Sequence, residues 1–171
     1  VYKVTVKGHD VHFAAKKVAV TVEAERKGLQ DKMRKEFRAL QQAQHANIVH
    51  LIGVVDDDPT YLCLLMELAP LGSLRALLDS DAASVLGSEV AQLSLLSGTA
   101  AGMAFLHAQT PTPILHHDLK TDNVLVFPDA AHAYVAKITD FGMATGSQGS
   151  TMKTTKSKSG AGTLAYMAPE G

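Results

Sequence analysis

The sequence predicts an α+β fold arranged in two lobes. The first 68 residues hold four short apolar stretches and one amphipathic helical pattern, which favours a unit rich in β-sheet. The residues that follow are mainly helical in pattern and end in a hairpin and a polar loop. The charge also changes along the chain. Residues 1–50 carry 10 basic and 5 acidic side chains, whereas residues 51–147 carry 3 and 11, which suggests two units of different chemistry.

The first lobe is predicted to contain a four-stranded sheet and a helix. Alternating polar and apolar residues lead into a turn at Gly8, and the third and fourth stretches flank an acidic turn that contains Pro59. Met33, Phe37 and Leu40 follow the helical spacing. The expected elements are strands over 2–7, 11–20, 51–55 and 62–66, and a helix over 29–43.

The second lobe is predicted to begin with a short helix at Gly72-Ser73, which is followed by a long helix over 89–107. Helical spacing places Leu93, Leu96, Ala100, Met103 and His107 on one face of the long helix. A hairpin over 124–127 and 133–139 should turn at Pro128-Asp129. Residues 142–161 are rich in Gly, Ser, Thr and Lys, a composition typical of a mobile loop.

Composition excludes several classes of protein. The chain has 171 residues, of which 46% are hydrophobic and 19% charged, as in globular domains. Its net charge of −1 makes a nucleic-acid partner a poor prediction. Its apolar runs fall short of the ~20 residues of a membrane span, so we expect no membrane contact by this segment. The single cysteine, Cys63, excludes an intrachain disulfide and is expected to be a buried apolar residue.

Three short motifs occur in a fixed order in the second half. His116-His117-Asp118-Leu119-Lys120-Thr121-Asp122-Asn123 comes first. Asp140-Phe141-Gly142 begins 17 residues after the first motif, and Ala168-Pro169-Glu170 begins 28 residues after Asp140. Together they resemble the catalytic loop, the metal-binding motif and the end of the activation segment of protein kinases. The chain thus resembles a eukaryotic-type protein kinase catalytic domain, and within it the tyrosine-kinase-like group of serine/threonine kinases.

The resemblance implies a two-lobed protein-kinase-like fold, truncated at both ends. Residues 1–68 would form the upper lobe without its glycine-rich loop. Residues 69–171 would form the first part of the lower lobe, through the activation segment. The sequence starts with valine, so we expect it to be cut from a longer chain and to be inactive in isolation. The resemblance also implies a cytoplasmic location, or the cytoplasmic domain of a larger protein.

The implied activity is transfer of the γ-phosphoryl group of Mg-ATP to a Ser or Thr hydroxyl of a protein substrate. By resemblance, Asp118 would accept the proton of that hydroxyl and Lys120 would steady the transferred group. Asn123 and Asp140 would offer oxygen ligands to Mg²⁺, which prefers hard donors. Lys120 and the pair Gly162-Thr163 resemble the serine/threonine pattern rather than the tyrosine one. The alternative reading is a pseudokinase that binds ATP or a partner without transferring phosphate.

Kinases pair a strand lysine with a helix glutamate to hold the phosphates, and two positions compete for the lysine. Glu36 lies on the apolar stripe of the predicted helix, where a carboxylate is costly unless a cation pairs with it. Strand alternation puts Ala14 and Lys16 on one face, as over the nucleotide of the family. In an alternative alignment of this strand with the family's pattern, Thr21 stands where the lysine would be, which would favour a pseudokinase. We favour Lys16.

The stretch 62–69 resembles the last upper-lobe strand and the hinge. By that match Met66 is the gatekeeper, and the Glu67 carbonyl and the Ala69 N–H would meet the adenine edge. The family's hydrophobic spine matches Leu40, Leu51, His116 and Phe141, so His116 is expected to be a core histidine.

One residue departs from the kinase pattern. His117 stands where the family has an arginine that clamps a phosphorylated activation loop, and histidine lacks the fork geometry and the permanent charge of arginine. We therefore expect weaker dependence on that clamp. The hydroxyls that could be phosphorylated are Ser150, Thr151, Thr154, Thr155, Ser157 and Ser159, interleaved with Lys153, Lys156 and Lys158.

Overall fold

The structure is a computed structural model. It describes residues 1–5, 8, 10–20, 27–28, 31, 36–38, 40–55, 60–80, 87–129, 134–141, 145–146 and 163–166. The predicted turn at 56–59, the residue Thr21, the loop hydroxyls at 150–159 and the motif 168–170 lie outside these residues.

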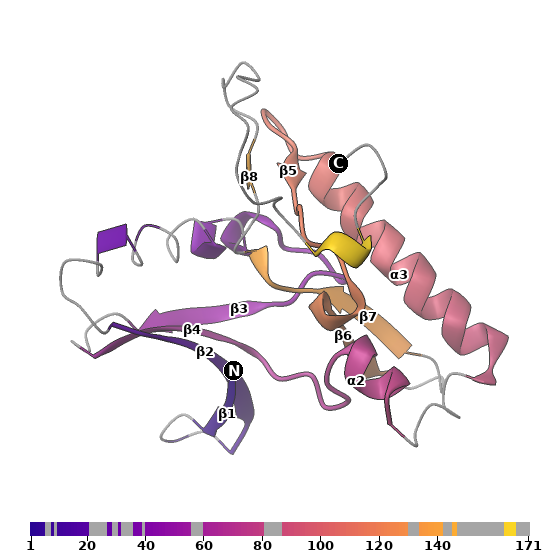
Figure 1. Ribbon diagram of the computed structural model, residues 1–171, viewed down its shortest axis with the longest axis horizontal. Helices are drawn as coiled ribbons and strands as arrows, with labels where there is room; N and C mark the ends of the chain where they lie inside the picture. The colour runs from indigo at the N-terminus through magenta and orange to yellow at the C-terminus, as the bar shows by residue number, and fades with distance from the viewer. Residues whose placement is uncertain are drawn as a thin grey trace.

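The first half of the chain forms a four-stranded antiparallel sheet (Figure 1). Its strands are β1 (Tyr2–Thr5), β2 (His12–Ala19), β3 (Leu51–Val55) and β4 (Tyr61–Glu67), in the spatial order β1-β2-β4-β3. All four predicted strands are therefore confirmed, with ends that differ by at most a few residues. Gly8, with φ of 87°, lies between β1 and β2 in a backbone conformation that suits glycine.

Alternation along β2 separates two neighbouring lysines. In the register of β2 with β4, Ala14 lies opposite Met66 and Lys16 lies opposite Leu64. The side chains of Ala14 and Lys16 share the inner face of the sheet, where Ala14 is buried. Lys17 is exposed on the other face, where its Nζ lies 3.4 Å from the centroid of the Tyr61 ring. Of these two lysines, Lys16 projects toward the inside of the molecule, in agreement with the alternation seen in the sequence.

A helical segment covers the inner face of the sheet. Residues 36–38 and 40–42 are helical within the predicted span 29–43. Glu36 and Leu40 are both buried, as the apolar stripe predicted. Phe37 packs on a small core of Leu62 and Leu64 from β4, so the helix is held against the sheet by apolar contact.

The second half combines helices with a hairpin. Helix α2 (Leu74–Leu78) begins after Ser73, whose Oγ accepts a hydrogen bond from the Ala76 N–H at 3.2 Å. Helix α3 spans Glu89–His107, as predicted, and lies along β7 (Tyr134–Ile138), which pairs with β6 (Val124–Pro128). The described helices include none that is long and apolar enough to cross a membrane.

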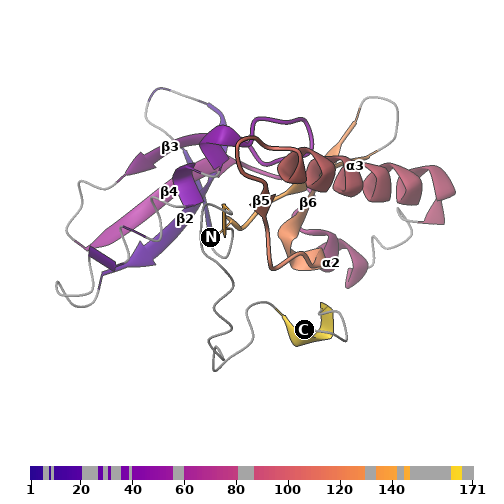
Figure 2. The same ribbon diagram turned by 90° about the horizontal axis from the view of Figure 1, so that it is seen from above.

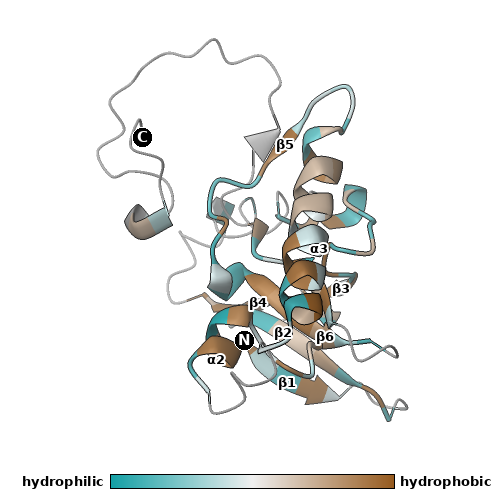
Figure 3. Cartoon of the chain, turned by 90° about the vertical axis from the view of Figure 1, so that its right-hand side faces the viewer, coloured by the Kyte–Doolittle hydropathy of each residue, from teal (hydrophilic) through white to brown (hydrophobic). Residues whose placement is uncertain are grey.

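The face of α3 that helical spacing marked in the sequence is not the face that the fold buries. Leu93 and Leu96 are 65% and 67% exposed, and the buried residues of the helix are Ala91, Leu95, Gly102 and Leu106. The helix has leucines on its exposed side as well as on its buried side, and Figure 3 shows apolar residues among polar ones along the side that faces the viewer, so periodicity does not single out one face. Close packing decides instead. A Cβ on Gly102 would lie 2.8 Å from the Asn47 carbonyl oxygen. The helix therefore packs most closely on the face that carries Gly102.

One core joins the two halves of the molecule, which lie side by side in Figure 2. Val49 donates its N–H to the Ile138 carbonyl at 2.9 Å, and the Ile138 N–H binds the Asn47 carbonyl at the same distance. Asn47 also donates from Nδ2 to the Ala136 carbonyl at 2.8 Å. Hydrogen bonds therefore hold the segment between the helix and β3, which includes Asn47 and Val49, against β7. The shared core consists of Leu40, Ala43, Ile48, Val49, Met66, Leu106, Ile114, Ile138 and Phe141.

Several short elements among the described residues were not predicted from the sequence. Strand β5 (Ile114–Leu115) pairs with β8 (Thr145–Gly146), and a 3₁₀ turn, η2 (Thr121–Asn123), follows the first motif. Elements of two or three residues are too short for a periodic pattern. The β5–β8 pair places residues 145–146 beside residues 114–115, directly before the first motif.

Candidate active site

His116 anchors the first motif in the core. Its ring is 1% exposed, packs edge-on against Phe141 with centroids 5.2 Å apart, and lies 2.9 Å from the Thr139 carbonyl. Because Nδ1 accepts the Asp118 N–H at 3.3 Å, the proton is on Nε2 and is donated to Thr139. Burial lowers the pKa of His116 more than the Thr139 carbonyl raises it. His116 is therefore a neutral core histidine, as predicted, and orients the backbone of Asp118.

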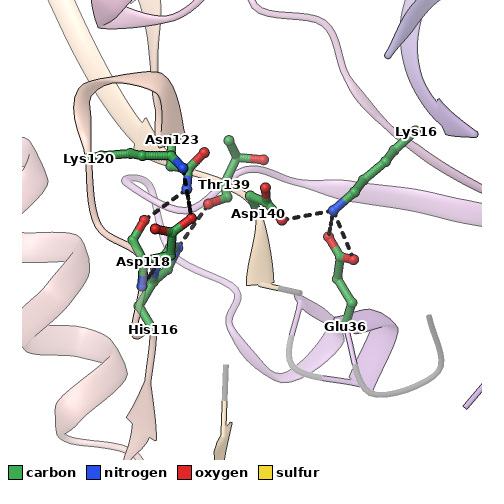
Figure 4. Close-up of polar contacts among 8 residues, drawn as sticks. All are labelled: Lys16, Glu36, His116, Asp118, Lys120, Asn123, Thr139 and Asp140. Carbon is green, nitrogen blue, oxygen red and sulfur yellow. Dashed lines mark hydrogen bonds and ion pairs between the residues drawn. The ribbon is translucent and has the colours of Figure 1, made fainter. Parts of the chain in front are cut away.

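Asp118 is the centre of a network of donors. Its Oδ1 accepts the Thr163 hydroxyl at 2.8 Å, and its Oδ2 lies 2.9 Å from Lys120 Nζ and 3.2 Å from Asn123 Nδ2. Lys120 also donates to the Thr163 hydroxyl at 2.8 Å. One carboxylate is thereby held by three side chains. Two of them, Lys120 and Asn123, come from its own loop and are drawn in Figure 4.

These contacts set the protonation of the network. Burial acts to raise the pKa of Asp118, but the hydrogen bonds from Lys120 and Thr163 outweigh it and hold that pKa below its ordinary value. The hydrogen bond to Asp118 raises the pKa of Lys120. At neutral pH the aspartate is therefore an anion beside an ammonium group, a state in which it can accept hydrogen bonds from a hydroxyl.

Asn123 joins Asp118 to the second motif. It is buried, and its Nδ2 donates to the Asp118 carbonyl at 2.8 Å as well as to the side chain of Asp118. Its own carbonyl accepts the Thr139 N–H at 3.0 Å. Because both amide hydrogens are directed at Asp118, the side-chain oxygen of Asn123 is the atom left to face a ligand.

Lys16 connects β2 to the helix and to the second motif. Its Nζ lies 2.8 and 3.0 Å from the two carboxylate oxygens of Glu36 and 2.8 Å from Asp140 Oδ1 (Figure 4). Burial lowers the pKa of Lys16, but the charges of Glu36 and Asp140 raise it above its ordinary value. Burial raises the pKa of Glu36 by more than Lys16 lowers it. The cation that buried Glu36 requires is therefore Lys16.

A cavity of about 280 Å³ opens between the two lobes. Seven of the residues that the sequence assigned to the nucleotide line it, and Glu36 lies behind Lys16. The cavity joins the candidate adenine edge at one end to the candidate metal ligands at the other. The lining is Val1, Ala14, Lys16, Val49, Met66, Glu67, Leu68, Ala69, Gly72, Asp122, Asn123, Leu125, Thr139 and Asp140.

The sequence analysis missed the partners of two site residues. Lys137 of β7 places its Nζ 2.8 Å from both carboxylate oxygens of Glu67, a pair between the end of β4 and the lower hairpin. Thr163 bridges Asp118 and Lys120. The signal for Thr163 was present, since Gly162-Thr163 had been read as a mark of serine/threonine specificity. The signal for Lys137 was absent, because a lysine in a half-exposed strand is ordinary.

Two residues of the motifs have an unusual backbone. His117 and Asp140 both have φ of 64°, in the left-handed region that non-glycine residues rarely adopt. Such conformations cost of the order of 1–3 kcal/mol and are found where the surroundings hold a residue in place for function. Each turn lies next to a site carboxylate, since His117 precedes Asp118 and Asp140 is itself in the site.

Comparison with known proteins gives the family. The family described as the protein kinase domain matches residues 1–171. The chain belongs to the protein kinase family. The mouse protein mitogen-activated protein kinase kinase kinase 10 is 36% identical over 99% of this kinase chain. Serine/threonine-protein kinase CTR1 of Arabidopsis thaliana is 37% identical over 80% of it, and probable serine/threonine-protein kinase PBL25 of the same plant is 35% identical over 90%.

The family confirms two predictions from the sequence. The fold is the predicted α+β, two-lobed kinase fold, and the relatives support membership of the tyrosine-kinase-like group. This kinase chain spans 17%, 16% and 39% of the three relatives' own lengths, in the order given above.

Proposed function

We propose that the chain is the central part of a serine/threonine protein kinase, which transfers the γ-phosphoryl group of Mg-ATP to a protein hydroxyl. The observation that carries the proposal is the joint geometry of the motifs. Asp118, with Lys120 2.9 Å away, lies beside a cavity whose lining includes Lys16 in contact with Glu36 and Asp140. Phosphoryl transfer depends mainly on positioning and on neutralising charge, and this arrangement supplies both.

The cavity suits a nucleotide. Buried Ala14 and Met66 offer apolar walls for a flat base, and the backbone of Glu67 and Ala69 lies at the same end for its polar edge. Lys16 lies at the opposite end, where its ammonium group would meet phosphate oxygens in place of Asp140. Glu36 would keep the lysine in position while the phosphates are bound, because it holds Nζ with both carboxylate oxygens.

The residues at the phosphate end fit Mg²⁺. Asp140 offers a carboxylate and Asn123 an amide oxygen, both lining the cavity, and Mg²⁺ in phosphoryl-transfer sites uses one or two such ligands together with phosphates and water. The described residues contain no group of three or more His, Cys, Asp or Glu side chains that could hold a metal ion, so phosphates and water would complete the shell. When bound, the ion neutralises the charge of the phosphates.

Asp118 is proposed to act on the substrate hydroxyl. Its pKa is held below the ordinary value, so at neutral pH it is an anion that accepts the hydroxyl proton as the oxygen bonds to the γ-phosphorus. The bond from that phosphorus to the oxygen of the departing diphosphate breaks in the same displacement. Lys120 would meet the charge on the transferred group, and Thr163 would hold the carboxylate in line. Use of ATP agrees with a cytoplasmic site of action.

Labelled phosphate transfer from Mg-ATP to a generic protein substrate tests the proposal. The full-length protein is compared with its Asp118→Asn variant, which keeps the shape of the side chain and loses its charge. We expect the variant to be slower by a factor of about 10²–10⁴. Phosphoserine and phosphothreonine should be the products.

A pseudokinase is the alternative, favoured by His117 in place of the family's arginine. If this alternative is right, the wild type and Asp118→Asn should bind nucleotide with equal affinity. Neither of them should transfer phosphate under conditions in which a control kinase is active.

A further inference from the structure

Two contacts attach a short segment near the end of the chain to the loop that carries Asp118. The Thr163 hydroxyl donates to Asp118 Oδ1 and accepts from Lys120 Nζ, each at 2.8 Å. Three residues later, the Tyr166 hydroxyl lies 2.9 Å from the Thr121 hydroxyl. The second contact joins the same two parts of the molecule, but it involves no group to which the proposed chemistry gives a role.

A single helical turn makes the two contacts depend on each other. Leu164–Tyr166 form the 3₁₀ turn η4 (yellow in Figure 1), and the Tyr166 N–H donates to the Thr163 carbonyl at 2.9 Å. On the other side, Thr121 is the first residue of η2 and directly follows Lys120. The hydrogen bond of a 3₁₀ turn closes its two ends onto each other. A shift of Tyr166 therefore also moves the Thr163 hydroxyl.

The Thr163 hydroxyl tolerates little displacement. It has one hydrogen to donate, which it gives to Asp118, and its oxygen accepts a hydrogen from the Lys120 ammonium group. Both contacts are 2.8 Å long, and such hydrogen bonds weaken beyond about 3.2 Å. Productive catalytic arrangements must be held within about 0.5 Å. Whatever fixes η4 on the loop therefore also protects the alignment of Asp118 and Lys120.

Packing holds Tyr166 only in part, because the residue is 48% exposed. An exposed side chain loses conformational freedom when it is fixed in one place, so a contact must offset that cost. The hydroxyl of half-buried Thr121 supplies such a contact at 2.9 Å. This pair of hydroxyls thus ties the far end of η4 to the loop.

We propose that Thr121 and Tyr166 form a positioning pair for phosphoryl transfer. Their hydrogen bond holds η4 in the place where Thr163 keeps the Asp118 carboxylate and the Lys120 ammonium group aligned. The inference rests on the proposed function and adds two positioning residues to it. The pair acts through Thr163 and not on the reacting atoms.

Steady-state kinetics of the full-length protein, with Mg-ATP and a generic protein substrate, test this inference. Tyr166→Phe removes the tyrosine hydroxyl and keeps the ring, and Thr121→Val removes the threonine hydroxyl and keeps the shape of the side chain. Each should lower kcat about fivefold, the effect of one ordinary hydrogen bond, with little change in the KM for ATP. The double variant should be no slower than either single variant, because both remove the same hydrogen bond. Thr121→Ser should restore most of kcat, because it restores the hydroxyl.

The Thr163→Val background separates positioning from a merely structural role. If the pair acts through Thr163, Tyr166→Phe should cause no further loss of kcat in that background. A general loss of folded protein would instead multiply the loss in both backgrounds. The matched control is Tyr134→Phe, which removes a tyrosine hydroxyl from β7 in the lower hairpin and should keep the wild-type kcat.

Several outcomes would overturn this inference while phosphate transfer by the wild type stands. An unchanged kcat in Tyr166→Phe would do so, and so would a further loss of kcat when Tyr166→Phe is added to Thr163→Val. A raised KM for the protein substrate at unchanged kcat would assign Tyr166 to substrate binding and overturn the inference too. Absence of transfer from the wild type would instead refute the proposed function, and this inference would fall with it.

Discussion

Replacement of Lys16 by methionine should destabilise the fold through Glu36. The substitution keeps the length of the side chain and removes the ammonium that lies 2.8 and 3.0 Å from the two Glu36 oxygens. Glu36 is only 4% exposed, so water cannot replace the lost partner. A buried carboxylate without a cation is far more costly than the buried pair.

The burial of the two side chains sets the size of the effect. Loss of one partner from a buried pair costs about 3–5 kcal/mol. The Lys16 side chain is 27% exposed, so its end of the pair is partly hydrated and screened. We therefore expect a loss of about 2–3 kcal/mol in the free energy of unfolding, a large part of the 5–15 kcal/mol that is typical of a domain.

The loss should depend on pH in a defined direction. Burial already raises the pKa of Glu36, and without Lys16 that pKa rises further. An acid whose folded pKa lies above its unfolded pKa contributes stability at low pH, which is lost as the pH rises through the folded pKa. The difference between wild type and Lys16→Met should therefore be small near pH 4.5 and full near pH 8.

Denaturant unfolding of the full-length protein, followed by circular dichroism at several pH values, measures this difference. The matched control is Lys17→Met, one residue along β2, where the lysine lies exposed over Tyr61 and should cost at most about 1 kcal/mol. The double variant Lys16→Met, Glu36→Leu should recover much of the loss, because no charge stays buried. Equal losses for the two lysine variants, with no pH dependence, would refute the reasoning.

Three further predictions concern other parts of the structure. Thr163→Val removes the hydroxyl that bridges the loop aspartate and lysine, and should lower kcat about tenfold or more with little change in the KM for ATP, whereas Thr163→Ser should retain most activity. His116 has a lowered pKa, so the unfolded chain takes up its proton first; stability should fall as the pH drops below about 6.5, and His116→Gln should flatten that part of the profile in thermal unfolding. Gly102→Ala should destabilise by about 1–3 kcal/mol despite the better helix propensity of alanine, because its Cβ would lie 2.8 Å from the Asn47 carbonyl; an unchanged or raised melting temperature would contradict the observed packing.

The sequence by itself determined the family and the longer elements of the fold. Helix α3 and strand β3 have the predicted bounds, because a long run of helix-compatible residues marks the helix and a short apolar run beside an acidic turn marks the strand. The motif residues Asp118 and Asp140 were found without coordinates, because their spacing in the chain is itself the signal. Alternation along β2 separated Lys16 from Lys17, because a strand sends neighbouring side chains to opposite faces.

Tertiary structure decided whatever depends on contacts between distant residues. The apolar pattern of α3 pointed to Leu93 and Leu96, but the close approach of Asn47 to Gly102 selected another face. The pair of Glu67 with Lys137 joins residues 70 positions apart, and the bridge from Thr163 to Asp118 spans 45. Local patterns hold no information on such pairs, because their geometry arises only when the lobes pack and side chains from different elements come within hydrogen-bonding distance.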